Sequence, residues 1–259
     1  EDLRELFARL RPEIVSILGP AMERSAAIPR SILNGHHPVA AQQAFNREVA
    51  QAMGFDFAAG RIDTTTHPFC TETGPDDCRL TTRYNEADFT QSFYGIMHEA
   101  GHGLYDQGLP KEHYGTPLGS SVSLGIHESQ SRLWENHVGR SRTFWAKWLP
   151  RAQELFPHLR KVKLDAFMKE MLRSEFSFIR VEADEATYDL HILLRFGIER
   201  RLVKGELLGV LELVNPGGSG ADGGTFGPIQ EELARALAAH VARTADLARA
   251  VERLEREQL

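Results

Sequence analysis

Two histidines and a glutamate occur at a spacing that can hold and use a metal ion, in the segment His98-Glu99-Ala100-Gly101-His102. Four residues make slightly more than one turn of an α-helix, so the imidazoles of His98 and His102 project from one face and can reach a single ion. Glu99 lies beside that face, where its carboxylate can take a proton from an attacking water without binding the metal. The pattern predicts a zinc site with Glu99 as the catalytic base of a hydrolase.

A third ligand must come from elsewhere, because catalytic zinc usually has three protein ligands and one open position. Glu128 is the best candidate, since it lies on the next predicted helix beyond a turn-rich connection. His127 competes for the role, but adjacent helical residues point about 100° apart, so we expect only one of the pair to face the ion. Glu135 is expected to be either solvated or an acceptor for an imidazole N–H.

Gly101 lies inside the predicted helix, where glycine is less favourable than alanine by about 1 kcal/mol. A purely structural helix would have little reason to accept it, which favours a functional site. The alternative interpretation is an exposed helix with two incidental histidines.

The elements that position these residues are predicted to be mainly helical. Asn85 can cap the helix that carries the two histidines, and a further helical run begins near Leu124. The segment 54–84 is rich in Thr, Asp, Gly and Pro, and within it the run 79–84 is a candidate for strand or extended loop. Apolar periodicity indicates further helices over 2–25, with a kink or break at Pro12, and over 38–53, 164–175 and 182–203.

The end of the chain has a different character. Residues 206–214 are apolar and suited to a strand, and a glycine-rich loop leads from there to a final helix over 228–259. Apolar residues alternate at three and four along that helix, so we expect it to pack on another helix. The fold class expected is therefore mainly α: a helical zinc-metallopeptidase domain with a small β element and a long C-terminal helix.

The composition is that of an ordinary globular protein, with 42% hydrophobic residues, 25% charged residues and a net charge of −6. A nucleic-acid-binding protein would usually show a basic excess, so we expect no nucleic-acid partner. No run of about 18 apolar residues is present, which predicts no membrane span, and the lack of a signal-peptide pattern favours a cytoplasmic location. We interpret the two cysteines, Cys70 and Cys78, as reduced thiols, with a second metal site or a disulfide as the alternative.

Five motifs in order resemble the M32 family of metallocarboxypeptidases, the carboxypeptidase Taq type. They are His67-Pro68-Phe69, Asp77-Cys78-Arg79-Leu80-Thr81, the segment 98–102, His127-Glu128-Ser129-Gln130, and Ile179-Arg180-Val181-Glu182-Ala183-Asp184-Glu185. The resemblance implies that His98, His102 and Glu128 bind zinc or cobalt and that Glu99 is the general base and acid. It also implies removal of single residues from the C-termini of peptides, a largely helical fold with the site in a deep groove, and a homodimer.

Three further residues are candidates for binding substrate. Arg180 can clamp the terminal carboxylate of a peptide through a bidentate pair, or it can be a buried partner of Asp184, four residues further along the same predicted helix. Arg79 is a weaker candidate for the same clamp. His67 precedes a proline that extends the backbone, and it is either structural or a substrate contact.

The resemblance covers residues 1–204, and family members are considerably longer. Residues 205–259 instead resemble the end of a GAF sensory domain, so we expect a peptidase region over 1–204 and a GAF-like remnant of one strand and a long helix over 205–259. The function expected is that of a zinc-dependent metallocarboxypeptidase. The alternatives are a catalytically inactive metal-binding remnant, and a signalling or dimerisation module that acts through the GAF-like tail.

Overall fold

The computed structural model describes residues 2–177, 180 and 183–205. These divide into two compact units, one formed by residues 2–18 with the described residues from 177 onward, and the other by residues 19–176. The predicted strand at 206–214 and the predicted final helix lie outside the described residues.

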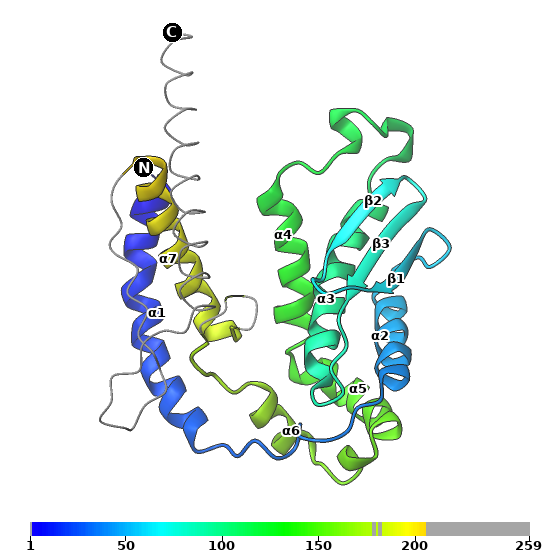
Figure 1. Ribbon diagram of the computed structural model, residues 1–259, viewed down its shortest axis with the longest axis vertical. Coiled ribbons are helices and arrows are strands. Elements are labelled where there is room, and N and C mark those ends of the chain that lie inside the picture. Colours follow the sequence, from blue (N-terminus) through cyan, green and yellow to red (C-terminus); the bar gives the residue numbers. More distant parts are fainter. Residues whose placement is uncertain (1, 178–179, 181–182, 206–259) are drawn as a thin grey trace, which may run out of the picture. The chain divides into compact units, whose positions relative to one another are not determined.

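The described chain is mainly helical, as the sequence predicts, with one small sheet (Figure 1). The α-helices are α1 (Asp2–Ala26), α2 (Val39–Met53), α3 (Phe89–Gln107), α4 (Leu124–Arg132), α5 (Arg142–Leu155), α6 (Leu164–Met171) and α7 (Glu185–Val203). A π-helical segment, Leu133–Val138, follows α4 directly, and short 3₁₀ turns lie at Lys111–His113, Pro117–Gly119 and Pro157–Leu159. None of the described helices is long and apolar enough to cross a bilayer.

The sheet consists of β1 (Gly60–Thr64), β2 (Cys70–Gly74) and β3 (Asp77–Thr82), in the order β1-β3-β2. β3 pairs in parallel with β1 and antiparallel with β2. Cys78 and Leu80 of β3 are buried against Ile96 and Ala100 of α3, so one face of the sheet lies on this helix. Only β3 overlaps the run 79–84 that the sequence offered as strand or extended loop. The other two strands were not predicted, because they are short and lie in a segment with the composition of a loop.

Helix α3 is buried along its length by two clusters. Its first half joins an aromatic cluster that links it to α2, α5 and α6 through Phe45, Phe93, Trp145 and Phe167. Further along, Ile96 and Ala100 join the smaller cluster beneath the sheet. A helix buried in this way offers a rigid frame for the side chains that it carries.

Two local predictions need correction. The N-cap of α3 is Asp88, whose carboxylate accepts a hydrogen bond from the backbone N–H of Thr90 at 2.9 Å. Asn85 instead accepts from the N–H of Ala87, which forms a turn before the helix. Helix α1 continues without a break through Pro12, on a stretch where the chain is exposed and water can satisfy the carbonyl that proline leaves free.

His37 gives a test of the aromatic core. Its side chain is fully buried, at 0% exposure, among the rings of Phe89, Phe156 and His158, and neither ring nitrogen has a hydrogen-bond partner. Burial first, and then the neighbouring His158, lower the pKa of His37 below its ordinary value, while the backbone carbonyl of Glu86 and then the charge of Asp88 oppose them. The folded protein therefore resists a proton that the unfolded chain accepts.

We expect the contribution of His37 to stability to be complete above the ordinary histidine pKa of about 6.5 and to be lost as the pH falls below it. His37→Leu should therefore raise the free energy of unfolding over the parent by roughly 1 kcal/mol more at about pH 5 than at about pH 7.5. Urea unfolding at the two pH values measures the difference. An exposed histidine outside this cluster provides the control: His67→Leu should show no comparable gain at low pH, and equal behaviour of both variants would contradict the role of His37.

Candidate metal centre

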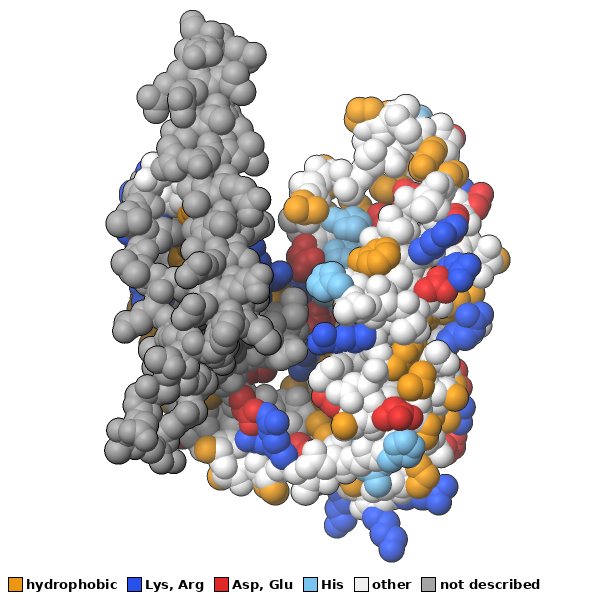
Figure 2. Space-filling model, in the orientation of Figure 1, with side chains coloured by type: hydrophobic (Ala, Val, Ile, Leu, Met, Phe, Trp, Pro, Cys, Tyr) orange, Lys and Arg blue, Asp and Glu red, His pale blue; other side chains and the backbone are white. Residues whose placement is uncertain are grey.

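Three side chains from α3 and α4 meet in the larger unit. His98 and His102 lie one turn apart on α3, and their Nε2 atoms are 3.2 Å from each other. Glu128, on α4, places Oε2 3.2 Å from Nε2 of His102 and 3.5 Å from Nε2 of His98. Figure 2 shows histidine and acidic side chains gathered on the surface over these two helices. The three ligand atoms thus form a nearly equilateral triangle.

This triangle fits a tetrahedral divalent ion. Zinc bonds to imidazole nitrogen and carboxylate oxygen at about 2.0–2.2 Å, so two ligand atoms of a tetrahedral site lie about 3.3 Å apart. The three distances, 3.2, 3.2 and 3.5 Å, bracket that value. Two imidazoles and one carboxylate are also a ligand set used by catalytic zinc, with one tetrahedral position left for a group that is not protein.

A carboxylate behind the triangle sets the orientation of His98. Glu135, in the π-helical segment, lies with Oε2 2.8 Å from Nδ1 of His98 and is itself bound by Arg132 at 2.9 Å. Because a carboxylate accepts, Nδ1 carries the proton, and Nε2 is left as the atom that can bind a metal. Of the two alternatives for Glu135, the structure shows the imidazole acceptor; its side chain is 14% exposed.

His127 is directed away from the triangle. Its ring stacks on that of His102, with centroids 4.4 Å apart and planes 13° apart, and its Nε2 lies 2.8 Å from Oδ1 of Asp106. Adjacent helical residues point in different directions, so Glu128 faces the two histidines of α3 while His127 faces Asp106. Asp106 was not a sequence candidate, although it lies four residues after His102 on the same face of the helix.

The charges in the site are strongly coupled. Burial raises the pKa of Glu99 to about 7, with His98 opposing and Glu128 and Glu135 adding to the rise. Burial acts against the charged form of His98 as well, yet its hydrogen bonds to Glu128 and Glu135 raise its pKa to about 9. Burial would also raise the pKa of Glu128, but the hydrogen bonds from His102 and His98 hold it well below its ordinary value. Without a metal, Nε2 of His98 therefore carries a proton as well as Nδ1, and a cation that binds Nε2 must displace that proton.

Gly101 explains how α4 comes so close to α3. A Cβ at this position would lie 2.6 Å from Cα of Ser131 and 2.8 Å from the carbonyl oxygen of Gln130, both backbone atoms of α4. No side chain fits there, so the glycine has a packing reason as well as the functional one that the sequence suggested. Glu128 is one turn before this contact, and the contact therefore sets its distance from the histidines.

The residues expected to bind substrate lie on three separate segments of the chain. Arg79 alternates with the buried Cys78 and Leu80, so it points to the sheet face away from α3, where it pairs with Asp77 at 2.7 Å. His67 lies exposed in the loop between β1 and β2. Arg180 belongs to the other compact unit and donates to the hydroxyl of Tyr188 at 2.6 Å.

The predicted helical pairing of Arg180 with Asp184 is wrong in its geometry. Helix α7 begins at Glu185, and Asp184 is its N-cap, accepting from the backbone N–H groups of Ala186 and Thr187. Arg180 therefore precedes the helix and does not share a face of it with Asp184. The capping carboxylate starts the helix at Glu185, later than the start at 182 that apolar periodicity indicated.

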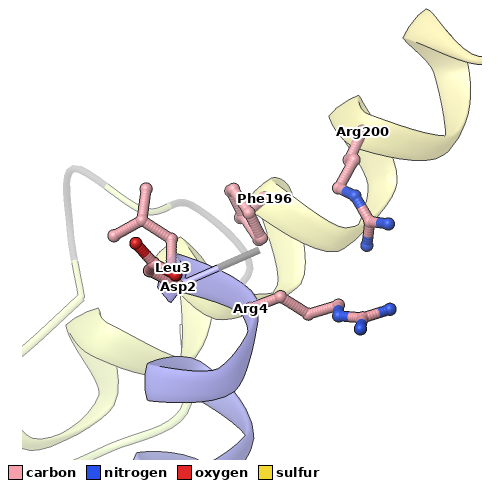
Figure 3. Close-up of a pocket in the computed structure, with 5 residues that line it drawn as sticks. All are labelled: Asp2, Leu3, Arg4, Phe196 and Arg200. Carbon is pink, nitrogen blue, oxygen red and sulfur yellow. The ribbon is translucent and has the colours of Figure 1, made fainter.

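Each unit contains a pocket that none of the three triangle residues lines. In the smaller unit, a pocket of about 350 Å³ is lined from α1 by Asp2, Leu3 and Arg4 and from α7 by Phe196 and Arg200 (Figure 3). In the larger unit, a pocket of about 310 Å³ is bordered by Trp134, Phe144 and Trp148. Neither contains a set of three ligands for a metal, so the triangle is the better candidate for chemistry.

A helix bearing H-E-x-x-H, packed against a second helix that contributes a glutamate, is the arrangement of the zinc metallopeptidases. The family model described as carboxypeptidase Taq (M32) metallopeptidase matches residues 1–213. This chain belongs to the M32 family of metallopeptidases.

Named relatives agree with this assignment. The chain is 50% identical to thermostable carboxypeptidase 1 of Thermus thermophilus, over 80% of this chain and 40% of the relative. It is 38% identical to carboxypeptidase 1 of Bacillus subtilis, over 79% of this chain and 41% of the relative. Among solved structures, the M32 carboxypeptidase of Deinococcus radiodurans matches with a TM-score of 0.74 and 44% identity, over 78% of this chain and 41% of that one. The chain thus spans about two fifths of the length of these relatives.

The contact at Gly101 yields a test of the geometry. Gly101→Ala should lower the free energy of unfolding by about 1–3 kcal/mol, because the methyl group would push α4 from α3, although alanine favours the helix. It should also weaken zinc binding, since Glu128 moves with α4. Urea unfolding and zinc titration measure the two effects.

The matched control lies on α4. A Cβ at Gly125 would have its nearest neighbour at 4.0 Å, so Gly125→Ala should not lower stability and should leave zinc affinity close to that of the parent. If both alanine variants behave alike, the close approach at Gly101 does not determine the site.

Proposed function

We propose that this chain carries the metal centre and the general base of a zinc-dependent metallocarboxypeptidase. The observation that supports this is the triangle of His98, His102 and Glu128, at ligand spacing, with the buried Glu99 next to it in the chain. The names of the relatives support C-terminal residues of peptides as the substrate. Zinc is the proposed metal, with cobalt as the substitute that the same ligands would accept.

The proposed chemistry divides between the metal and the protein. Zinc, when bound, supplies Lewis acidity to the attacking water and to the scissile carbonyl. Glu99 takes the proton of the water on its carboxylate and later returns it to the leaving amine. Burial of Glu99 suits both roles, because burial favours the protonated form and so opposes the charge of a bound cation, which favours the ionised one. Glu135 holds His98 in the tautomer that leaves Nε2 free.

Substrate binding by Arg180, Arg79 and His67 remains a proposal. Arg180 is the preferred clamp for the terminal carboxylate, since the guanidinium of Arg79 is already paired with Asp77. The division into a peptidase region, 1–204, and a GAF-like tail, 205–259, is likewise proposed, as are the homodimer and the cytoplasmic location. The family model extends to residue 213, slightly beyond that boundary.

Two alternatives lead to different results. A catalytically inactive remnant would bind zinc at the same triangle but would not hydrolyse peptides. A signalling or dimerisation module would act through the tail, which lies outside the described residues, and would not depend on Glu99. Metal content measured together with hydrolysis of blocked peptides separates the three functions.

The ligand set gives the first test. Replacing His98, His102 or Glu128 by alanine should weaken zinc binding by more than the 10- to 100-fold typical of losing a residue that only orients a ligand. His127→Ala is the control and should retain the metal, because its ring nitrogen faces Asp106. Metal analysis after dialysis measures the effect; zinc loss on His127→Ala with retention on Glu128→Ala would transfer the role to His127.

The base gives the second test. Glu99→Gln keeps the shape of the side chain but cannot take a proton, so it should retain the zinc of the parent and lose about 10²- to 10⁴-fold in hydrolysis of C-terminal residues. Assays of zinc content and peptide hydrolysis on the same preparation measure both. An active parent with an equally active variant would eliminate Glu99 as the base, and a parent with full zinc but no hydrolysis would support the inactive remnant.

A further inference from the structure

A second group of side chains of the types that can bind a metal lies between the sheet and α3. It consists of Cys70 at the start of β2, Cys78 in β3 and Asp106 near the end of α3. The two sulfur atoms are 3.7 Å apart, and Sγ of Cys70 is 3.8 Å from Oδ2 of Asp106. Both cysteines are free thiols. The group contains both cysteines of the sequence.

The strand register explains why the thiols meet. Cys70 pairs with Leu80 across the antiparallel ladder, and Glu72 pairs with Cys78, so all four side chains lie on one face of the sheet. That face lies against α3. A Cβ at Gly103 would come within 3.1 Å of Sγ of Cys78, so this glycine lets the helix approach the thiol closely. Asp106, three residues later, lies on the same side of the helix.

The distances match those of a tetrahedral ion with thiolate ligands. Zinc bonds to thiolate sulfur at about 2.3 Å, which places two sulfurs of a tetrahedral site about 3.8 Å apart. The observed 3.7 Å agrees with this. An ion that binds two thiolates in a line would separate them by twice the bond length, which is farther than the sulfurs lie here. The geometry therefore favours zinc or cadmium over linear two-coordinate ions.

The surroundings favour a cation. Cys78 is 2% exposed, and the pKa of the Cys70 thiol is raised by its hydrogen bond to Cys78, by burial, and by the charges of Asp106 and Glu99. The pKa of Glu72 is raised by burial and by the charge of Asp106. Several groups that can become negative thus share a small volume. A divalent ion would relieve this repulsion.

We propose that Cys70, Cys78 and Asp106 form a second metal site, for a soft divalent ion with tetrahedral preference such as zinc or cadmium. Both thiols lose their protons to solvent as the two metal–sulfur bonds form, and no electron is transferred. Asp106 uses Oδ2 toward the cysteines and Oδ1 toward His127, so one carboxylate can serve both contacts. Cys70 is partly exposed, which gives the ion a path of entry.

Cobalt titration of the full 259-residue chain tests this proposal. The protein is first reduced and kept anaerobic, and a thiol assay in denaturant verifies two free thiols. Cobalt bound to thiolate gives a sulfur-to-metal charge-transfer band, whereas the triangle of histidines and glutamate contains no sulfur. The band therefore reports the cysteine site alone, and the amount of cobalt bound reports both sites.

The parent should bind two cobalt ions per chain and develop the band. A Cys70→Ser and Cys78→Ser double variant should bind one cobalt without the band, and the retained ion would show that this variant folds. A His98→Ala and His102→Ala double variant should keep the band and bind one cobalt. Asp106→Asn should weaken the band-forming ion by at least tenfold, as expected when a carboxylate ligand becomes an amide.

The outcomes that would overturn the proposal are specific. A parent with two free thiols that saturates without a charge-transfer band does not bind metal through them. A band that survives in the serine double variant does not arise from these cysteines. If the parent binds only one cobalt ion and shows the band, the triangle does not bind metal. That result would count against the proposed peptidase function and would leave the second site supported, so the two failures are distinguishable.

Discussion

The close approach of α3 and α4 at Gly101 is the constraint on which the candidate site depends. Two histidines on one helix can be aligned by helical periodicity alone, but Glu128 comes from another helix, and its distance is set by packing. Backbone atoms of α4 occupy the space that a side chain at Gly101 would need. Protein interiors are packed densely enough that one methyl group at such a contact must displace something.

This contact is effective because α3 is held along its length. The aromatic cluster with Trp145 and the smaller cluster with Leu80 bury successive parts of the same helix. The helix therefore has little freedom to move toward or away from α4. Charged groups that repel or attract one another strongly, such as Glu99, Glu128 and His98, can be kept together only by such a frame, because their desolvation is unfavourable.

The parts of the site that were predictable from the sequence are those fixed by local periodicity. The alignment of His98 with His102 follows from their spacing, and the divergence of His127 from Glu128 follows from the angle between neighbouring helical residues. The sheet was largely missed because β1 and β2 have loop-like composition and depend on pairing with β3, across the chain. Asp106 was also missed, although the same four-residue spacing that links the two histidines extends to it. Asn85 and Asp88 are both suitable caps for α3. Asn85 is engaged in the preceding turn, where it accepts from Ala87, so Asp88 caps the helix.

The π-helical segment Leu133–Val138 lets the orientation of Glu128 and the packing of the following residues be set separately. In a continuous α-helix the one would fix the other. Upstream, α4 must present Glu128 to the histidines; downstream, Trp134 and Val138 pack on the aromatic cluster that leads into α5. The wider turn, with the N–H of Gly139 bonded to the carbonyl of Trp134 five residues earlier, introduces a rotational offset between these two stretches. Within that offset Glu135 reaches back to His98. The direction in which α4 presents Glu128 is thereby independent of the direction in which Trp134 and Val138 face the core. A change in the aromatic packing need not rotate the carboxylate that faces the ion.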